Sequence, residues 1–271
     1  MSDTDARVAV ITGAASGIGR GLAEYAASRG LRLVLGDIDA ACLATVAEML
    51  SERGAEVAWQ LTDVSQPQHL ETLRDLAVQR FGGVDLLFNN AGIMQTGLCW
   101  EVDAAKWQRM LDINLNGVLN GIRSFMPLLL QQKRPAHVIN TASLAGLINS
   151  PLLGPYNVTK QAVVAISETL HYELAMLDAP IVVSVLCPGP VASSIMESNS
   201  RIGDADAQLD TLLGSRIREG MSPLELAQQV FAAIDEQRFW IFPHKFFKPA
   251  LQRRLQSMLD ETNPVLQLAQ E

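Results

Sequence analysis

The chain of 271 residues has a formal net charge of −8, with 48% hydrophobic and 18% charged residues. This length suits one large α/β domain, and the composition can fill a sizeable core, which argues against disorder. Lys and Arg form no run along the chain, so neither a nucleic acid nor a membrane surface is an expected partner.

The cysteines and the chain start give no sign of export or metal binding. Cys42, Cys99 and Cys187 lie far apart and match neither a metal-ligand spacing nor a disulfide framework. The first residues are polar and acidic, unlike a signal peptide, and the apolar run at 125–130 is too short to cross a bilayer. We therefore expect a cytoplasmic protein that has no metal site.

Apolar runs and helical patterns alternate along the first half of the chain. The pattern predicts strands at 8–11, 31–35, 55–61 and 84–88. It predicts intervening helices at 18–28, at 39–53 and from Pro67 to about residue 82. Ser65 and Gln68 fit a capping box at the start of the third helix.

The alternation continues through the second half. Strands are predicted at 137–140, 181–186 and 239–242, and helices at 103–132, 155–177 and 222–236. The long helix at 103–132 contains Asn114, Asn116 and Asn120, which are poor helix formers. Two segments, 192–220 and the tail 243–271, break the pattern.

Strands that alternate with helices predict right-handed crossovers and a parallel sheet covered on both faces. No Pro/Gly/Ser-rich linker divides the chain, and no internal repeat is visible. The sequence therefore predicts an α/β protein whose residues 1–271 form a single doubly wound Rossmann domain, with a sheet of about seven strands.

A glycine-rich turn separates the first strand from the first helix. It reads Thr12-Gly13-Ala14-Ala15-Ser16-Gly17-Ile18-Gly19, one residue longer than the usual dinucleotide fingerprint. Glycines permit positive φ and a close backbone approach, and the helix start favours a pyrophosphate. A plain tight turn is the alternative reading, but the position after the first strand favours cofactor phosphates bound by Thr12, Gly13, Ser16, Gly17, Ile18 and Gly19.

Asp37 ends the second strand, where an acidic residue would accept hydrogen bonds from the ribose hydroxyls. A carboxylate there would repel a 2′-phosphate, and the neighbouring Ser16 and Ile38 carry no positive charge to bind one. The sequence therefore favours NAD over NADP, with Asp37 and Ile38 at the cofactor. A loop residue without a ligand is the alternative for Asp37.

Tyr156 and Lys160 lie one helical turn apart on the same face of a predicted helix. A phenol titrates near 10, and lowering its pKa by about three units takes about 4 kcal/mol, which Lys160 and a positively charged nicotinamide can supply. Ser143 follows the fifth strand, where ligands gather in such sheets, and its hydroxyl can bond a substrate oxygen. Alone, each residue also fits a solvated helix face or a turn.

Taken together, these motifs resemble those of the short-chain dehydrogenase/reductase family in its short single-domain form. The resemblance covers about residues 8–242. The motifs occur in the family's order and spacing: Thr12-Gly13-x-x-x-Gly17-x-Gly19, Asp63-Val64, Asn89-Asn90-Ala91-Gly92, Asn114, Ser143, Tyr156-x-x-x-Lys160 and Pro188-Gly189.

The resemblance implies specific roles. Tyr156 would be the general acid/base, Lys160 would bind the nicotinamide ribose and lower the tyrosine pKa, and Ser143 would orient the substrate oxygen. Asn114 would hold a water in a proton relay. Further cofactor contacts would come from Asp63 and Val64 at the adenine, from Asn90, Ala91 and Gly92 along the ribose and nicotinamide side, and from Pro188, Gly189, Val191 and Ser193 at the nicotinamide.

The resemblance also implies that segment 192–220 closes over the substrate. Its apolar residues are Ile195, Met196, Leu209, Leu212 and Leu213, and the opposite wall would comprise Met94, Leu144 and Leu153. Arg201, Arg216 and Arg218 fit either surface positions, which are the favoured reading, or a site for an anionic group of the substrate. We expect a medium-sized, mainly apolar secondary alcohol or ketone, either aryl or steroid-like, because the stretches around Asn114 and Tyr156 resemble members that oxidise aryl side-chain alcohols.

Family members are usually tetramers or dimers, so a homotetramer or homodimer is expected. The apolar final strand at 239–242 needs cover from a second subunit or from the tail. Two other classes of protein also fit parts of this sequence. One is a non-catalytic nicotinamide-binding sensor or scaffold on the same fold, and the other is a serine hydrolase using Ser143, which lacks the flanking glycines of a nucleophile elbow.

Overall fold

The computed structural model describes residues 6–193, 195, 214–215 and 217–265. Its centre is a seven-stranded parallel sheet with the order β3-β2-β1-β4-β5-β6-β7. The strands are β1 (Val8–Thr12), β2 (Arg32–Asp37), β3 (Val57–Leu61), β4 (Leu86–Asn89), β5 (Ala136–Thr141), β6 (Ile181–Leu186) and β7 (Trp240–Ile241). The predicted fold class is confirmed, and the strand order reverses between β1 and β4, where such sheets bind ligands.

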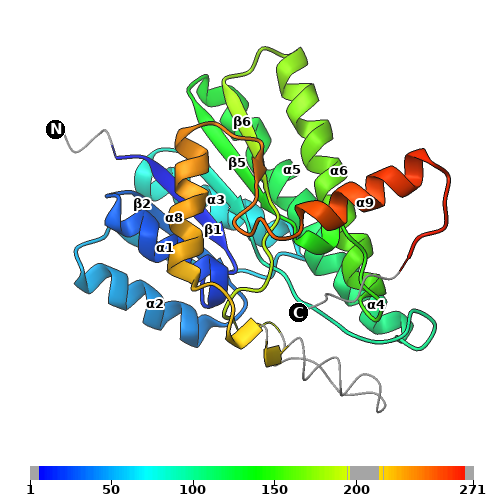
Figure 1. The fold of residues 1–271 in the computed structure, drawn as a ribbon. Helices are drawn as coiled ribbons and strands as arrows, with labels where there is room; N and C mark the ends of the chain where they lie inside the picture. The colour runs from blue at the N-terminus through cyan, green and yellow to red at the C-terminus, as the bar shows by residue number, and fades with distance from the viewer. Residues whose placement is uncertain (1–5, 194, 196–213, 216, 266–271) are drawn as a thin grey trace.

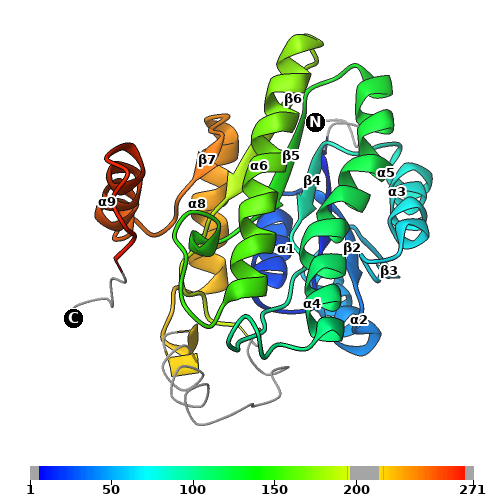
Figure 2. The ribbon, with the colours of Figure 1, turned by 90° about the vertical axis from the view of Figure 1, so that its right-hand side faces the viewer.

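Helices cover both faces of the sheet (Figures 1 and 2). The helices on one face are α1 (Gly17–Ser28), α2 (Ala40–Glu52) and α8 (Pro223–Asp235), and those on the other are α3 (Pro67–Phe81), α5 (Gly117–Gln132) and α6 (Gly154–Met176). β1 shows why the central strands are apolar throughout. Ala9 and Ile11 pack in the first cluster, while Val8 and Val10 pack in the second.

The predicted long helix at 103–132 is interrupted in its middle. It consists of α4 (Ala104–Leu111), a π-helical turn η1 (Asp112–Asn116) and α5. π-turns inside helices are rare and are frequent at functional sites. Two of the three asparagines that weakened the helix prediction, Asn114 and Asn116, lie in this turn, and Asn114 is fully buried. Asn120 lies within α5.

The start of α3 differs from the prediction. The N-cap residue is Gln66, without a side-chain cap bond, and Pro67 opens the helix. The hydroxyl of Ser65 instead donates to Asp63 Oδ1 at 2.7 Å, so the predicted capping box is wrong. The capping box would use the Ser65 oxygen as an acceptor for an N–H of the first helical turn. The charged carboxylate of Asp63 is a strong hydrogen-bond acceptor, so the hydroxyl donates to it instead.

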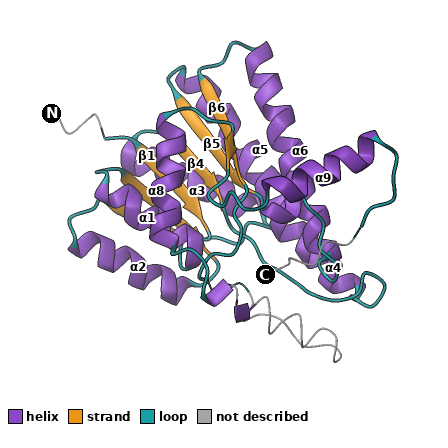
Figure 3. Cartoon of the chain, viewed as in Figure 1, coloured by secondary structure: helices purple, strands orange, loops and turns teal. Residues whose placement is uncertain are grey.

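The two segments that broke the alternation leave the sheet after β6 and β7. Val191 and Met221 form an isolated parallel bridge, which ties the two ends of the predicted closing segment together. In the tail, Phe247 is buried and the helix α9 (Lys248–Leu259) follows, standing away from the sheet (Figures 2 and 3). In the described part of the chain, no helix has the length and apolar character needed to span a membrane.

Candidate active site

The glycine turn lies at the carboxyl end of β1, where the strand order reverses. Gly13 and Gly17 have φ of +68° and +49°, in the left-handed region that favours glycine. A Cβ at Gly19 would lie 2.0 Å from the carbonyl oxygen of Gly13, so the turn and the helix touch backbone to backbone. Ser16 is the N-cap of α1 and makes no side-chain cap bond, which leaves the first-turn N–H groups suited to a phosphate.

Thr12 holds this turn to the end of β4 rather than facing outward. Its Oγ1 accepts hydrogen bonds from the N–H groups of Asn90 at 2.9 Å and Ala91 at 3.1 Å, and it donates to the Phe88 carbonyl. Asn90 Nδ2 in turn donates to the Thr12 carbonyl at 3.0 Å. The side chain of Thr12 is buried, so it stabilises the backbone of the predicted cofactor site through these hydrogen bonds.

Asp37 reaches the same turn from the end of β2. Its Oδ2 accepts a hydrogen bond from the Ala15 N–H at 2.9 Å, and its Oδ1 accepts one from the Asp39 N–H at 3.0 Å. Each carboxylate oxygen can accept a second bond, so ribose hydroxyls remain possible donors. Ile38 beside it is 66% exposed.

The residues predicted at the adenine end lie after β3. Asp63 Oδ1 accepts from both the N–H and the hydroxyl of Ser65. Val64 is buried, and its carbonyl accepts a hydrogen bond from Asn120 Nδ2 at 2.9 Å. Asn120, a second buried asparagine of the long helical region, therefore fixes the loop that carries both predicted residues.

The position of Gly92 is close to the side chains of both Asn114 and Lys160. Asn114 Oδ1 accepts from the Ile93 N–H at 2.8 Å, and its Nδ2 donates to the Ile93 carbonyl at 2.9 Å. A Cβ at Gly92 would lie 3.3 Å from Asn114 Oδ1 and 3.5 Å from Lys160 Nζ. The π-turn therefore brings an asparagine from between α4 and α5 to the same glycine that the lysine of α6 approaches.

Tyr156 and Ser143 complete the group. Lys160 Nζ donates to the Thr141 carbonyl at 2.9 Å and lies 5.7 Å from the centroid of the Tyr156 ring. Ser143 follows β5, and its Oγ accepts a hydrogen bond from the Ala145 N–H. Its hydroxyl lies near enough to the Tyr156 phenol to lower the pKa of that phenol. All four residues predicted for catalysis thus lie together at the carboxyl ends of β4 and β5.

Burial shifts the two titratable groups in opposite directions. It raises the pKa of the Tyr156 phenol, and the nearby Ser143 hydroxyl partly opposes this. It lowers the pKa of Lys160 to about 8, an effect that the buried Cys187 partly opposes. In the chain alone, removal of the phenolate from water outweighs its contacts with the protein. The lowered tyrosine pKa expected from the sequence depends on Lys160 together with a bound, positively charged nicotinamide, and it stays a prediction.

The residues predicted at the nicotinamide follow β6. The Leu144 N–H donates to the Pro188 carbonyl at 2.9 Å, and a Cβ at Gly17 would lie 2.9 Å from Ser193 Cβ. Val191 is buried beside Met221. The segment after β6 therefore contacts both the glycine turn and the loop that carries Ser143.

Apolar residues surround Tyr156. It shares a buried cluster with Met94, Leu153, Met110, Ala145 and Ile217, and Ile195 packs against it. Two of the predicted substrate residues, Met94 and Leu153, are therefore at the phenol. Leu144 belongs instead to a cluster under α6 and β6. Met196, Leu209, Leu212, Leu213, Arg201 and Arg216 lie outside the described residues.

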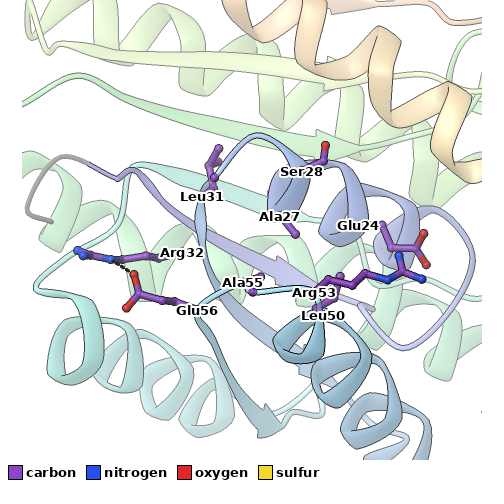
Figure 4. Close-up of a pocket in the computed structure, with 11 residues that line it drawn as sticks. Glu24, Ala27, Ser28, Leu31, Arg32, Leu50, Arg53, Ala55 and Glu56 are labelled. Carbon is purple, nitrogen blue, oxygen red and sulfur yellow. Dashed lines mark hydrogen bonds and ion pairs between the residues drawn. The ribbon is translucent and has the colours of Figure 1, made fainter. Parts of the chain in front are cut away.

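A large hollow lies at the opposite, amino end of the sheet (Figure 4). It has a volume of about 370 Å³ and lies between the ends of α1 and α2 and the starts of β2 and β3. An ion pair of 2.8 Å between Arg32 and Glu56 lies on one side of it. None of the predicted site residues lines this hollow, so the predicted chemistry stays at the carboxyl edge.

The sequence profile of the short chain dehydrogenase family matches residues 7–202. A dehydrogenase/reductase of CLA biosynthesis from Lactiplantibacillus plantarum is 31% identical over 97% of each chain. The chain belongs to this family. The diacetyl reductase ((S)-acetoin forming) of Staphylococcus epidermidis is 34% identical over 76% of this chain and 79% of the relative.

A solved structure confirms the family fold over the whole length. The short-chain dehydrogenase/reductase of Burkholderia phymatum, crystallised with NAD, superposes with a TM-score of 0.95 at 37% identity and covers 100% of both chains. The protein is therefore an oxidoreductase that acts on CH–OH groups of small molecules with a nicotinamide cofactor. The sensor and hydrolase alternatives gain no support from these relatives.

Several residues with roles in this geometry escaped the sequence analysis. Thr141 supplies the carbonyl that holds Lys160, and Thr159 Oγ1 lies 3.3 Å from Asn114 Nδ2. His244 in the tail accepts a hydrogen bond from the Gly189 N–H. No local pattern marks these contacts, because each joins segments far apart in the sequence.

Proposed function

We propose that the protein interconverts a secondary alcohol and a ketone with NAD(H), and that Tyr156 is its acid/base. The observation that carries this proposal is the buried Tyr156 phenol, near Ser143 and 5.7 Å from Lys160 Nζ at its ring centroid, on the sheet edge that also carries a glycine turn suited to phosphates. Bound NAD⁺ would accept the hydride from the alcohol carbon. In that direction Tyr156 takes the hydroxyl proton, and in reduction it returns it.

The neighbouring side chains support this proton transfer. Ser143 holds the substrate oxygen beside the phenol, and the Lys160 ammonium stabilises the phenolate and binds the nicotinamide ribose. Asn114 is fully buried and reaches both Ile93 and Thr159. We infer that it holds the water through which the proton leaves the site.

The glycine turn and Asp37 fit an unphosphorylated ribose. The carboxylate of Asp37, at the end of β2, accepts hydrogen bonds from two backbone N–H groups. The next residue, Ile38, is exposed. A 2′-phosphate would face this negative charge without a basic partner at residue 38. These contacts support NAD as the cofactor.

The Michaelis constants for both cofactors test this preference. We expect NADP to show a KM about 5- to 30-fold above that of NAD, since an unfavourable charge pair near the surface amounts to about 1–2 kcal/mol. The double variant Asp37→Ala, Ile38→Arg should reverse the order, and Ile38→Leu serves as its control. A lower KM for NADP in the unaltered protein contradicts the assignment.

The walls around Tyr156 favour an apolar substrate. Met94, Met110, Leu153 and Ile217 form the buried cluster there, and none of them offers a charged partner. We infer a medium-sized, mainly apolar alcohol or ketone, of aryl or steroid-like shape. Turnover of a panel of aryl, steroid, sugar and acyl-chain secondary alcohols, read by nicotinamide absorbance, tests this, and preferential turnover of the sugars would contradict it.

Exposed apolar side chains support assembly into a homotetramer or homodimer. On α6, Tyr172, Met176 and Leu177 are 61%, 85% and 66% exposed, and Trp240 on the edge strand β7 is 36% exposed. Tyr172, His171 and Trp240 line a hollow of about 190 Å³ together with Phe239 and Glu168. Burying such a surface against a second copy is favourable.

We expect light scattering at micromolar concentration to give the mass of a dimer or tetramer. Tyr172→Glu should shift the mass towards smaller species, because it places a charge inside the proposed interface. Trp100→Glu is the control, since Trp100 is 79% exposed on a loop that contacts the start of α6, whereas Tyr172 lies near the other end of that helix. A monomer in the unaltered protein would count against the assembly.

A further inference from the structure

The turn after β6 has one backbone donor between two prolines. It reads Pro188-Gly189-Pro190, and because proline has no backbone N–H, Gly189 carries the one donor of these three residues. That N–H donates to Nδ1 of His244 at 3.0 Å. The acceptor comes from the tail, beyond β7. The turn next to the proposed nicotinamide position is therefore held by a residue from the far end of the chain.

His244 also packs closely against the turn. A Cβ at Gly189 would lie 3.1 Å from His244 Cγ and 3.2 Å from Leu144 Cδ1. On the other side, the Leu144 N–H donates to the Pro188 carbonyl at 2.9 Å. The turn is thus held between the tail and the loop that carries Ser143. A side chain at Gly189 would come into close contact with His244 and Leu144.

The surroundings keep the imidazole neutral and fixed. Burial lowers the pKa of His244, and the Pro190 carbonyl and Glu225 partly oppose this. Because Nδ1 accepts a hydrogen bond, the ring proton lies on Nε2. The ring meets Phe246 edge-on with centroids 5.8 Å apart, and the neighbouring Phe247 is buried. These contacts anchor the tail where the acceptor is needed.

We propose that His244 is a positioning residue for the nicotinamide half of the cofactor, acting through the Gly189 N–H on the turn from Pro188 to Val191. The inference rests on the proposed function in placing the nicotinamide beside this turn. Without the acceptor, the partly buried Gly189 N–H would lose its partner, and the turn would lose the contact that holds it to the tail.

Binding of NADH and of ADP-ribose, which lacks the nicotinamide, tests the inference in the full-length chain. His244→Leu removes the acceptor and should weaken NADH binding about fivefold to tenfold, in line with one lost hydrogen bond, while ADP-ribose binding stays within about twofold. His244→Asn can place its Oδ1 near the Nδ1 position and should restore NADH binding to within about twofold. The expected kinetic effect is on the cofactor KM, with kcat at saturation little changed.

Each other outcome has a definite meaning. Equal weakening of NADH and ADP-ribose, or unchanged NADH binding, in His244→Leu overturns the positioning role. Failure of His244→Asn to restore binding, when its thermal unfolding matches that of the unaltered protein, also overturns it. If the unaltered protein binds ADP-ribose and NADH with equal affinity, the nicotinamide does not contact the turn, and the proposed site fails rather than the role of His244 alone.

Discussion

Replacing Tyr156 with Phe is expected to lower kcat/KM by about 10³-fold, because it removes the proton donor and acceptor. The ring and its packing against the apolar cluster of Met94, Leu153 and Ile217 remain. NADH binding should therefore stay within about twofold of the unaltered protein. Steady-state kinetics with any alcohol that the protein oxidises, together with fluorescence titration of NADH, measures both effects.

The matched control is Tyr172→Phe. This tyrosine lies on the same helix, α6, but is 61% exposed and far along it from the site. It should leave kcat/KM unchanged. Near-normal turnover in Tyr156→Phe would remove Tyr156 from the mechanism, and loss of NADH binding would show that the phenol serves the cofactor rather than the proton.

Lys160→Met is expected to make the protein more stable and far less active. The burial that lowers the pKa of Lys160 from 10.5 to about 8 disfavours its charged form in the fold. Below about pH 8 this amounts to roughly 3 kcal/mol of destabilisation. Methionine removes it but leaves the Thr141 carbonyl without its donor, so we expect a net gain of about 1–2 kcal/mol in unfolding free energy.

The lowered pKa of Lys160 also makes the unfolding free energy depend on pH. Between pH 8 and 10.5 the unfolded chain binds more protons at Lys160 than the folded chain, so the stability of the unaltered protein rises with pH. Urea unfolding should therefore show the gap between the two proteins narrowing over this range. A variant less stable than the unaltered protein at neutral pH would contradict this explanation.

The loss of activity has a separate cause. Without the ammonium, the buried phenolate has lost a nearby positive charge, and kcat/KM should fall by about 10²- to 10³-fold at neutral pH. Lys248→Met is the control for both measurements, because Lys248 is exposed at the start of α9. It should change neither stability nor turnover appreciably.

Much of the fold was predictable because its signals are local. The apolar runs before Gly13 and Asp37 read as buried strands, and Asp39 and Ser222, the first residues of two predicted helices, cap α2 and α8 with their side chains. Strand edges were less accurate. The predicted strand 239–242 is reduced to Trp240 and Ile241, because only these residues pair with β6.

The grouping of the predicted catalytic residues was also predictable, since Ser143, Tyr156 and Lys160 lie at motif spacings and at strand ends. What the sequence missed depends on contacts between distant segments. The π-turn exists where Asn114 turns inward to bond Ile93, and the tail returns His244 to the turn after β6. The raised pKa of Tyr156 follows from tertiary burial, which no spacing encodes.

We infer that Tyr156 becomes a usable base only when Lys160 and a positively charged nicotinamide act on it together. Ultraviolet titration of the Tyr156 phenolate tests this, taken as the difference between the unaltered protein and Tyr156→Phe, without and with saturating NAD⁺. We predict a phenol pKa above its ordinary value of 10.0 in the free protein, because of burial, and a pKa lower by about three units with NAD⁺ bound. A pKa that stays above 10.0 with NAD⁺ bound would show that Tyr156 is not the base.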